Sequence, residues 1–280
     1  MKKILVLYHK NCPDGFGGAY AAWKKFGNKA DYIGIERYMP LENLIGRKEI
    51  YMIDFCYSLN ETKKIIENGK NITIIDHHVS AEKAVKICPK HSYSVNHSGA
   101  VLAWKYFYPD KPMPRLLKHI EDIDIWKFRT PHTKEISPVL ELIEFDFKKW
   151  DKFAKELENP AKRKKHIESG KTILKYREML IKRIVKNIEE VRFEKHKAFA
   201  INSPIFQSEI GNFIIKNKKA IGIIWSRKKG KINVSLRADK KINVAKIAEK
   251  YGGGGHKAAA GLAFKTKIKF LWKEITERKK

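Results

Sequence analysis

The sequence contains few cysteines and no long apolar run, and each shortage argues against a class of protein. Three cysteines occur among 280 residues, at positions 12, 56 and 88, and no two of them have the CxxC spacing. We therefore expect neither a disulfide framework nor a structural zinc site. No stretch approaches the roughly 18 to 20 consecutive apolar residues that span a bilayer. We therefore expect no association with a membrane.

The N-terminal segment has the opening of a secretory signal but not its length. Two lysines precede a short apolar run, residues 4–8, and His9 follows that run at once. A signal peptide needs a longer apolar region. We interpret the run as the first strand of the fold, in a cytoplasmic protein.

Acidic residues are also scarce relative to basic ones. The chain has 59 Lys and Arg against 31 Asp and Glu, a formal net charge of +28 at pH 7. Such a charge indicates a polyanionic partner, and nucleic acid is the first candidate. A lysine-rich and isoleucine-rich composition with a single glutamine, Gln207, is also typical of heat-loving organisms. The charge alone leaves both explanations open.

The first half of the chain has the pattern of an α/β domain. A chain of 280 residues forms two domains more naturally than one. Short apolar strands alternate with amphipathic stretches, which predicts a mostly parallel sheet with crossover helices on both faces. We predict this domain over residues 1–150. The expected strands are residues 4–8, 32–35, 49–53 and 72–75, and the expected helices are 17–26, 59–68, 100–108 and 115–123.

The second half predicts a helical linker over residues 151–194 and a smaller α+β domain over residues 195–280. The basic cluster Lys162–His166 in the linker fits either a solvated helix face or a contact with a nucleic-acid backbone. A short basic helix is expected from Phe270. The other expected elements are strands at 198–201, 220–225, 232–237 and 262–264 and a helix at 243–250.

Polar side chains follow three of the predicted parallel strands at the point where each strand ends. His9 and Asp14 follow the first strand, Asp54 follows the third, and Asp76-His77-His78 ends the fourth. The carboxyl ends of parallel strands share one edge of the sheet, where ligands bind in open α/β folds. We therefore expect these groups to converge.

The residue types at this edge indicate a site for hard cations. A further carboxylate pair, Asp122 and Asp124, ends the helix at 115–123, and Cys12 is the one sulfur among the candidate ligands. Such a set suits Mn²⁺ or Mg²⁺ better than structural zinc. Two ions about 4 Å apart would activate a water and neutralise the charge of a phosphoryl transition state. Asp54 is our candidate for a bridging carboxylate.

Two further features predict anion binding. Four consecutive glycines, residues 252–255, leave backbone amides open to an anion. Gly253, Gly254 and Gly255 are the expected contacts, and His256 and Arg237 would add charge-assisted hydrogen bonds to phosphate. Ser98 is expected to cap the next helix, whose exposed amides could receive an anion.

Taken together, these motifs resemble the DHH phosphoesterases that carry a DHH-associated C-terminal domain. The matching elements span nearly the whole chain in the family's order, and the ordered set is far more specific than Asp-His-His alone. They are the loop His9…Cys12-Pro13-Asp14-Gly15, the strand-end Asp54, Asp76-His77-His78, the segment Asp124–Phe128, and Gly252–His256 followed by Ala259-Ala260-Gly261.

The resemblance implies two domains facing each other across a cleft, with a manganese centre in the first and a grip on substrate phosphates in the second. It implies that Asp76 orients its neighbours and that His78 contacts the scissile phosphate. It also implies that Arg237 and His256 bind the substrate. The implied metal ligands are His9, Asp14, Asp54, His77 and Asp124.

Three positions leave the family pattern ambiguous. Many members have two aspartates separated by one residue in the first loop, and the first of them falls on Cys12 here. Three interpretations of Cys12 stay open. Its thiolate could bind the metal, its presence could leave one metal position weaker, or it could be a small residue that only fills the loop. His9 lies one residue further from Asp14 than the pattern suggests. Asp122 and Asp124 are both candidates for the last carboxylate ligand. We prefer Asp124, because an aromatic residue follows it four positions later.

These observations predict a metal-dependent hydrolase of phosphodiester or phosphomonoester bonds in nucleotides or short oligonucleotides, with exonuclease-like action. Two Mn²⁺ ions are expected, with Mg²⁺ as the alternative. The positive charge favours a short single strand as substrate. Two alternatives stay open: hydrolysis of a nucleoside bisphosphate, cyclic dinucleotide or polyphosphate, and a nucleic-acid-binding relative without catalysis. The sequence does not decide the sugar type, the cleavage polarity or whether the chain forms a homodimer.

Overall fold

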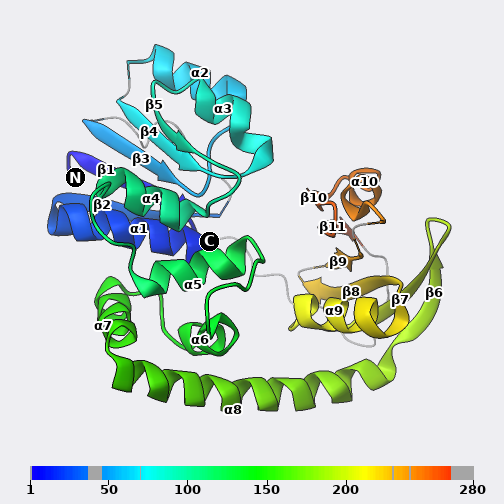
Figure 1. Cartoon of the computed structure of the whole chain (residues 1–280). Helices are drawn as coiled ribbons and strands as arrows, with labels where there is room; N and C mark the ends of the chain where they lie inside the picture. Colours follow the sequence, from blue (N-terminus) through cyan, green and yellow to red (C-terminus); the bar gives the residue numbers. More distant parts are fainter. Residues whose placement is uncertain (1, 37–45, 70, 229, 240, 266–280) are drawn as a thin grey trace, which may run out of the picture. The chain divides into compact units, whose positions relative to one another are not determined.

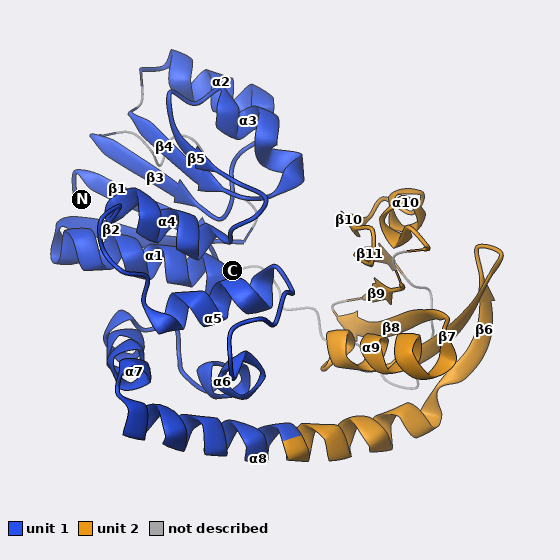
Figure 2. Cartoon of the chain, in the orientation of Figure 1, with its two compact units in different colours: residues 1–174 blue, residues 175–280 orange. Residues whose placement is uncertain are grey.

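The protein consists of two compact units, each built around its own sheet (Figures 1 and 2). The units are residues 1–174 and 175–280, and the division falls inside α8 (Pro160–Ile184). This helix lies within the segment for which the sequence predicts a helical linker. The structure, a computed structural model, describes residues 2–36, 46–69, 71–228, 230–239 and 241–265.

The first unit contains a five-stranded sheet in the order β2-β1-β3-β4-β5, with every neighbouring pair parallel. All five residues of β4 are buried, as expected for a strand covered on both faces. The predicted parallel sheet is confirmed, with β5 as an addition that its polar residues concealed. The strands are β1 (Ile4–His9), β2 (Ala30–Ile35), β3 (Glu49–Ile53), β4 (Ile72–Asp76) and β5 (Lys90–Tyr93).

Helices cover both faces of this sheet (Figure 1). One face carries α1 (Pro13–Phe26) and α4 (Gly99–Phe107), and the other carries α2 (Leu59–Glu67) and α3 (Glu82–Lys86). Three more helices enlarge the core on the α1–α4 side. They are α5 (Arg115–Asp124), α6 (Thr133–Leu140) and α7 (Phe147–Glu158). Short 3-10 turns, η1 (Gly27–Lys29) and η3 (Val79–Ala81), complete the unit.

Aromatic contacts tie α7 to α1 in the larger core. Phe16 of α1 stacks on Phe147 with ring centroids 4.7 Å apart, and it meets the fully buried Trp150 edge-on at the same distance. Aromatic side chains bury large areas, and offset or edge-on pairs add about 0.5–1.5 kcal/mol each. These contacts fix α1, which begins directly after β1.

Hydrogen bonds from side chains fix two helix starts. Ser58 and Glu61 form a capping box at the start of α2, because Ser58 Oγ accepts from the Glu61 amide and the Glu61 carboxylate accepts from the Ser58 amide. The Ser-x-x-Glu pattern that encodes this box begins at Ser58, directly before the first residue of the helix. Ser98 caps α4 as predicted, with its Oγ 3.4 Å from the amide of Val101.

The second unit contains a six-stranded mixed sheet in the order β10-β11-β9-β8-β7-β6. β7 and β8 are parallel and joined by α9 (Gln207–Lys218), and all other neighbours are antiparallel. The strands are β6 (Glu189–Phe193), β7 (His196–Asn202), β8 (Ile221–Lys228), β9 (Lys231–Arg237), β10 (Gly254–His256) and β11 (Ala259–Lys265).

The two helices of this sheet lie on opposite faces. Phe199 and Ile224 pack with α9, whereas Ala198 and Ile221 pack with α10 (Val244–Glu249). Residues 198 and 199 of β7 therefore point to opposite sides, as adjacent strand residues do. This arrangement confirms the predicted α+β character of the C-terminal region.

The second sheet begins earlier in the chain than the sequence predicts. β6 lies in the segment expected to be a helical linker, yet it pairs with β7, so the second sheet begins at Glu189. Ile188 separates β6 from a 3-10 turn, η4 (Val185–Asn187). The helix expected from Phe270 lies outside the described residues. Within the part of the chain that the structure describes, no helix combines the length and apolar content needed to cross a membrane.

Gly170 marks a close approach between α8 and α6, and its replacement tests this packing. A Cβ atom at Gly170 would overlap the carbonyl oxygen of Glu135. Since backbone cannot move cheaply, we expect Gly170→Ala to lower the free energy of unfolding by about 1–3 kcal/mol. Urea unfolding followed by tryptophan fluorescence measures this change.

The matched control is Ser169→Ala, because Ser169 is exposed on the same helix. This control should change the free energy of unfolding by less than about 0.5 kcal/mol. Equal unfolding midpoints for Gly170→Ala and the wild type would contradict the packing of α8 on α6 described above.

Candidate metal centre

The predicted metal-binding groups gather at the carboxyl ends of β1, β3 and β4. β1 lies between β2 and β3, so the strand order reverses at β1, and ligands of open parallel sheets bind at such a switch point. His9 ends β1, Asp54 follows β3 and Asp76 ends β4. Asp14 joins them from the first turn of α1.

Asp54 lies at the centre of this cluster. Its side chain is 2% exposed, with Oδ2 at 3.3 Å from His9 Nδ1 and Oδ1 at 3.2 Å from His77 Nε2. Burial alone would raise the pKa of Asp54, but the imidazoles of His77 and His9 outweigh burial and lower this pKa to about 2. The carboxylate is therefore ionised at neutral pH and can hold a cation.

The ring of His77 faces three carboxylates. Its Nε2 lies 3.2 Å from Asp54, 3.5 Å from Asp124 and 3.6 Å from Asp14. Burial alone would lower the pKa of His77, yet these carboxylates raise it to about 9. The cluster thus favours positive charge, either as a proton on the ring or as a cation held between these groups.

The amino terminus of α4 holds Asp14. The amides of Gly99 and Ala100 donate to Asp14 Oδ2 and Oδ1 at 2.6 and 2.9 Å. The sequence predicted that these amides would receive an anion, and the anion that they bind is the chain's own carboxylate. Burial, followed by the charges of Asp54 and Asp124, raises the pKa of Asp14 well above its usual value. A cation beside Asp14 would reverse that shift.

Two glycines permit the close approach of these elements. A Cβ atom at Gly99 would lie 2.8 Å from the Cβ atom of Asp54 and 3.0 Å from Asp14 Oδ2. A Cβ atom at Gly15 would overlap the carbonyl oxygen of His9. Gly99 was not among the predicted site residues. The only indication of its role in the sequence was its position directly after the capping residue Ser98.

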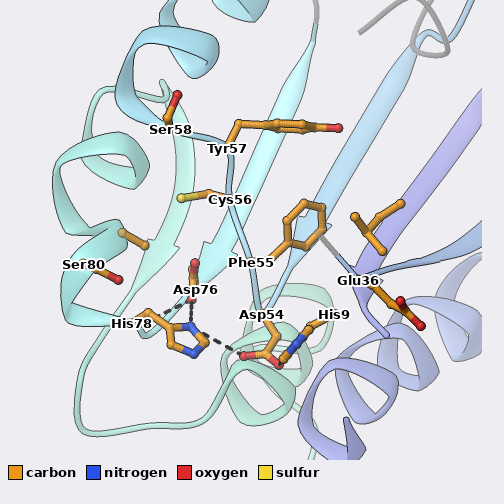
Figure 3. A pocket seen from close by; sticks show the side chains of 12 residues that line it. His9, Glu36, Asp54, Phe55, Cys56, Tyr57, Ser58, Asp76, His78 and Ser80 are labelled. Atoms are coloured by element: carbon orange, nitrogen blue, oxygen red, sulfur yellow. Dashed lines mark hydrogen bonds and ion pairs between the residues drawn. The ribbon is translucent and has the colours of Figure 1, made fainter. Parts of the chain in front are cut away.

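Asp76 orients His78 (Figure 3). Asp76 Oδ1 accepts hydrogen bonds from the amides of His77 and His78 at 2.7 and 3.1 Å, and His78 Nδ1 lies 2.7 Å from the same oxygen. A carboxylate partner requires Nδ1 to be the donor, which leaves Nε2 of His78 for another ligand. This hydrogen bond also raises the pKa of His78 against the opposing effect of burial.

The structure distinguishes Asp122 from Asp124. Asp122 is buried, and its carboxylate accepts the amides of Arg129 and Thr130 at 2.7 and 2.9 Å. Asp124 instead approaches His77, with Asp14 as the third member of that group. Asp122 therefore organises the following turn, and Asp124 is the carboxylate brought to the cluster.

Cys12 lies at the edge of the cluster. Its Sγ is within 4.8 Å of ligand atoms of His9 and Asp54. Burial, and then the charge of Asp54, raises the pKa of Cys12 to about 12, so the neutral thiol is favoured. A neutral thiol is a poor ligand for a hard cation, because metals bind the thiolate. Cys12 would therefore bind a cation only after losing its proton.

The donor atoms fit a hard divalent cation. Asp54 Oδ1, Asp76 Oδ2 and His77 Nε2 are buried, and none makes a hydrogen bond among the described residues. Asp54 Oδ1 and His77 Nε2 lie 3.2 Å apart as an ion pair without hydrogen-bond geometry. Leaving buried polar atoms unbonded is costly, and a bound cation would satisfy them. Asp54 belongs to two of the groups, as expected for a bridging ligand. Three groups have their donor atoms within 4.8 Å of one another: Asp54, Asp76, His77 and His78; His9, Cys12 and Asp54; and Asp14, His77 and Asp124.

A cavity of about 320 Å³ opens beside this cluster (Figure 3). Asp54, Asp76 and His78 line one part of it, and residues 55–58, which follow β3, line another. Space for a substrate group therefore lies directly against His78 and Asp54.

Arg237 of the second unit is fixed in position on β9. One guanidinium nitrogen lies 2.7 Å from Ser235 Oγ, and the other lies 3.1 Å from Ser208 Oγ. The side chain packs over Gly211, where a Cβ atom would overlap it. The guanidinium is therefore preorganised and stays charged.

The glycine run has a more regular structure than an open loop. Gly254–His256 form β10 and pair with β11, and His256 is exposed. The amides of Gly252 and Gly253 donate to the last carbonyls of α10 at 3.0 and 2.9 Å. The amide of Gly253 is therefore not open to an anion. We had expected Gly253 to bind an anion through this amide, and the hydrogen bond to α10 corrects that expectation. Close contact with Gly261 and Leu262 explains why residue 253 is glycine.

Sequence comparison finds a family match within the second unit and a relative that aligns over most of the chain. Residues 208–279 match the DHHA1 domain. The uncharacterized protein R106 of Acanthamoeba polyphaga mimivirus is 32% identical over 286 residues, which cover 93% of this chain and 67% of that protein.

Several solved structures share the fold, among them RecJ and PggH. RecJ in complex with Mn²⁺ from Thermus thermophilus has a TM-score of 0.56 at 14% identity, over 94% of this chain and 49% of that chain. PggH of Vibrio cholerae, a pGpG-specific phosphodiesterase, has a TM-score of 0.51 at 14% identity, over 94% of both chains. With the parallel sheet, the Asp-His-His strand end and the DHHA1 match, the chain belongs to the DHH phosphoesterase family.

Proposed function

We propose that this chain is a manganese-dependent phosphohydrolase that cleaves phosphodiester or phosphomonoester bonds in nucleotides or short oligonucleotides, as an exonuclease does. The observation that carries the proposal is the buried pair of candidate metal-ligand atoms, Asp54 Oδ1 and His77 Nε2, which lie 3.2 Å apart without a hydrogen bond among the carboxylates of the cluster. The proposal draws support from RecJ, which binds Mn²⁺, and from PggH, a phosphodiesterase of the same fold.

The cluster would hold two cations, with Mg²⁺ as the alternative to Mn²⁺. Asp54 belongs to two of the donor groups and is the candidate bridge, while Cys12 makes the His9 side the weaker position. When bound, the cations would neutralise the charge of the phosphoryl group and lower the pKa of a water. The proposed ligands are His9, Asp14, Asp54, His77 and Asp124.

His78 is the proposed contact to the scissile phosphate. Its Nδ1 is held by Asp76, and the raised pKa favours a proton on Nε2 as well. A protonated Nε2 would donate to a non-bridging phosphate oxygen and stabilise the charge that develops there. Asp76 serves this contact by keeping the ring in one orientation.

The second unit would bind the remainder of the substrate. Arg237 would receive a phosphate with a preorganised guanidinium, and Gly254, Gly255 and His256 would contact it along β10. Ser98 would act indirectly, because it caps the helix whose amides hold Asp14.

Asp54→Asn tests the assignment of the metal centre. We expect loss of activity beyond the roughly 10- to 100-fold that removal of an outer partner of a metal ligand costs. The reason is that the amide cannot supply the charge that His77 and the cations require. The assay is product release from a dinucleotide, a nucleoside bisphosphate and polyphosphate, each with Mn²⁺, Mg²⁺ or a chelator.

Asp151→Asn is the matched control. Asp151 is a partly buried carboxylate of the same unit that pairs with Lys24 and Lys155, outside the cluster. This variant should keep near-wild-type turnover. Full activity of Asp54→Asn, or wild-type activity in excess chelator, would contradict the proposal. Cleavage of polyphosphate alone would move the substrate to the small-phosphate alternative.

Gly99→Ala tests metal binding by a measurement that does not depend on enzyme activity. Mn²⁺ binds the folded state, so saturation at 100 times its dissociation constant should stabilise the wild type by about 2.7 kcal/mol. The added Cβ would displace Asp14 or Asp54, and we expect the Mn²⁺-dependent rise in unfolding temperature to shrink or vanish. Differential scanning fluorimetry with and without Mn²⁺ measures this rise.

Gly254→Ala is the control for this measurement, because a Cβ atom at Gly254 meets nothing within 4 Å. It should keep the full Mn²⁺-dependent rise. An equal rise in Gly99→Ala and Gly254→Ala would show that the amino terminus of α4 does not position a metal ligand.

A further inference from the structure

The turn that follows Asp124 exposes an aromatic residue. Trp126 follows Asp124 by two residues and is 54% exposed. Phe128 packs edge-on against it, with ring centroids 4.8 Å apart and an interplanar angle of 83°. The Asp124 carboxylate lies 3.5 Å from His77. A large flat ring is therefore presented to solvent within two residues of the metal-binding cluster.

The backbone of this turn is strained. Trp126 has a φ angle of 56° and Phe128 one of 49°, both in the left-handed region. This conformation costs an L-residue roughly 1–2 kcal/mol, and it is a clear outlier for a bulky side chain. The φ angle of Trp126 belongs to the Schellman motif that ends α5, because the amide of Trp126 donates to Ile123 and the amide of Lys127 donates to Asp122.

Asp122 enforces the conformation of the turn. Its carbonyl oxygen accepts the amides of residues 127–128 at 3.0 and 3.3 Å, and its carboxylate accepts the amides of residues 129–130 at 2.7 and 2.9 Å. The amide of Trp126 donates to Ile123 at 3.1 Å. The exposed ring thus has a fixed support, and a ligand that stacks on it would lose less free energy to ordering the protein.

Positive charges alternate with the rings. Lys127 and Arg129 are exposed, and the ammonium of Lys134 lies 5.9 Å from the centre of the Phe128 ring. Proteins that bind single-stranded nucleic acid combine aromatic rings, on which bases stack, with cations that contact the backbone. Polyphosphate and other phosphates without a base would gain nothing from an exposed indole.

We propose that Trp126, supported by Phe128, is a stacking platform for a base of a single-stranded oligonucleotide whose scissile phosphate lies at the metal centre. Lys127 and Arg129 would contact flanking phosphates. This inference rests on the proposed function and narrows it to substrates that carry bases. Because every base has a flat face, the platform favours single strands without selecting a sequence.

Binding without turnover tests the platform. Fluorescence anisotropy of a 3′-labelled tetranucleotide would be measured in chelator with the wild type, Trp126→Ala and Trp126→Phe. We expect Trp126→Ala to weaken binding by about 10- to 100-fold, since stacking on one base has that magnitude. Trp126→Phe should recover most of the loss, because the phenyl ring still offers a flat face.

Two controls make the result specific to stacking. Tyr176→Ala removes another exposed aromatic ring, 58% accessible on α8, and should bind like the wild type. A tetranucleotide of abasic residues should bind the wild type and Trp126→Ala equally. Unchanged affinity of Trp126→Ala for the intact strand, or equal losses for intact and abasic strands, would overturn the platform.

The outcome is separable from that of the proposed function. If Trp126→Ala binds like the wild type while the wild type hydrolyses oligonucleotides with Mn²⁺, the platform fails and the hydrolase stands. If binding depends on Trp126 as described but no substrate is hydrolysed, the platform stands and the hydrolase fails. Circular dichroism of each variant verifies that the fold is retained.

Discussion

Negative charge buried at the carboxyl edge of the parallel sheet is the constraint on which this site depends. Asp14, Asp54 and Asp76 are each at most 2% exposed. Charges so placed are strongly destabilising unless they are paired and hydrogen-bonded. Amides of α4 compensate Asp14, imidazoles compensate Asp54, and neighbouring amides compensate Asp76. Among the described residues, the buried atoms that still lack a hydrogen bond are Asp54 Oδ1, Asp76 Oδ2 and His77 Nε2, and a divalent cation would satisfy them.

The fold supplies each compensating group from a different element, so the site depends on packing over long sequence separations. The α4 amides reach Asp14 because Gly99 has no side chain in the space beside Asp54. Asp124 reaches His77 from the end of α5. A side chain at residue 99 would therefore displace the carboxylates of the metal-binding cluster more than the residues of the hydrophobic core. The same helix end leads into the turn that presents Trp126.

The sequence predicted the strand ends well, because the shared edge of parallel strands is a topological rule. His9, Asp54 and the residues 76–78 lie together for that reason. The amides that hold Asp14 were not assigned to it, since the contact joins residues 85 positions apart through helix packing. Hydrogen bonds of the turn, rather than spacing, separate Asp122 from Asp124. Strands such as β5 and β6 escaped detection because their residues are polar.

A crystal of the wild-type protein grown with Mn²⁺, with data collected at the manganese absorption edge, tests the central claim most directly. The account predicts anomalous density bonded to Asp54 and His77, with Asp14 and Asp124 among the remaining ligands and a weaker peak on the side of His9 and Cys12. The account would be contradicted if no anomalous density lay between these side chains, or if a single ion were held elsewhere on the chain.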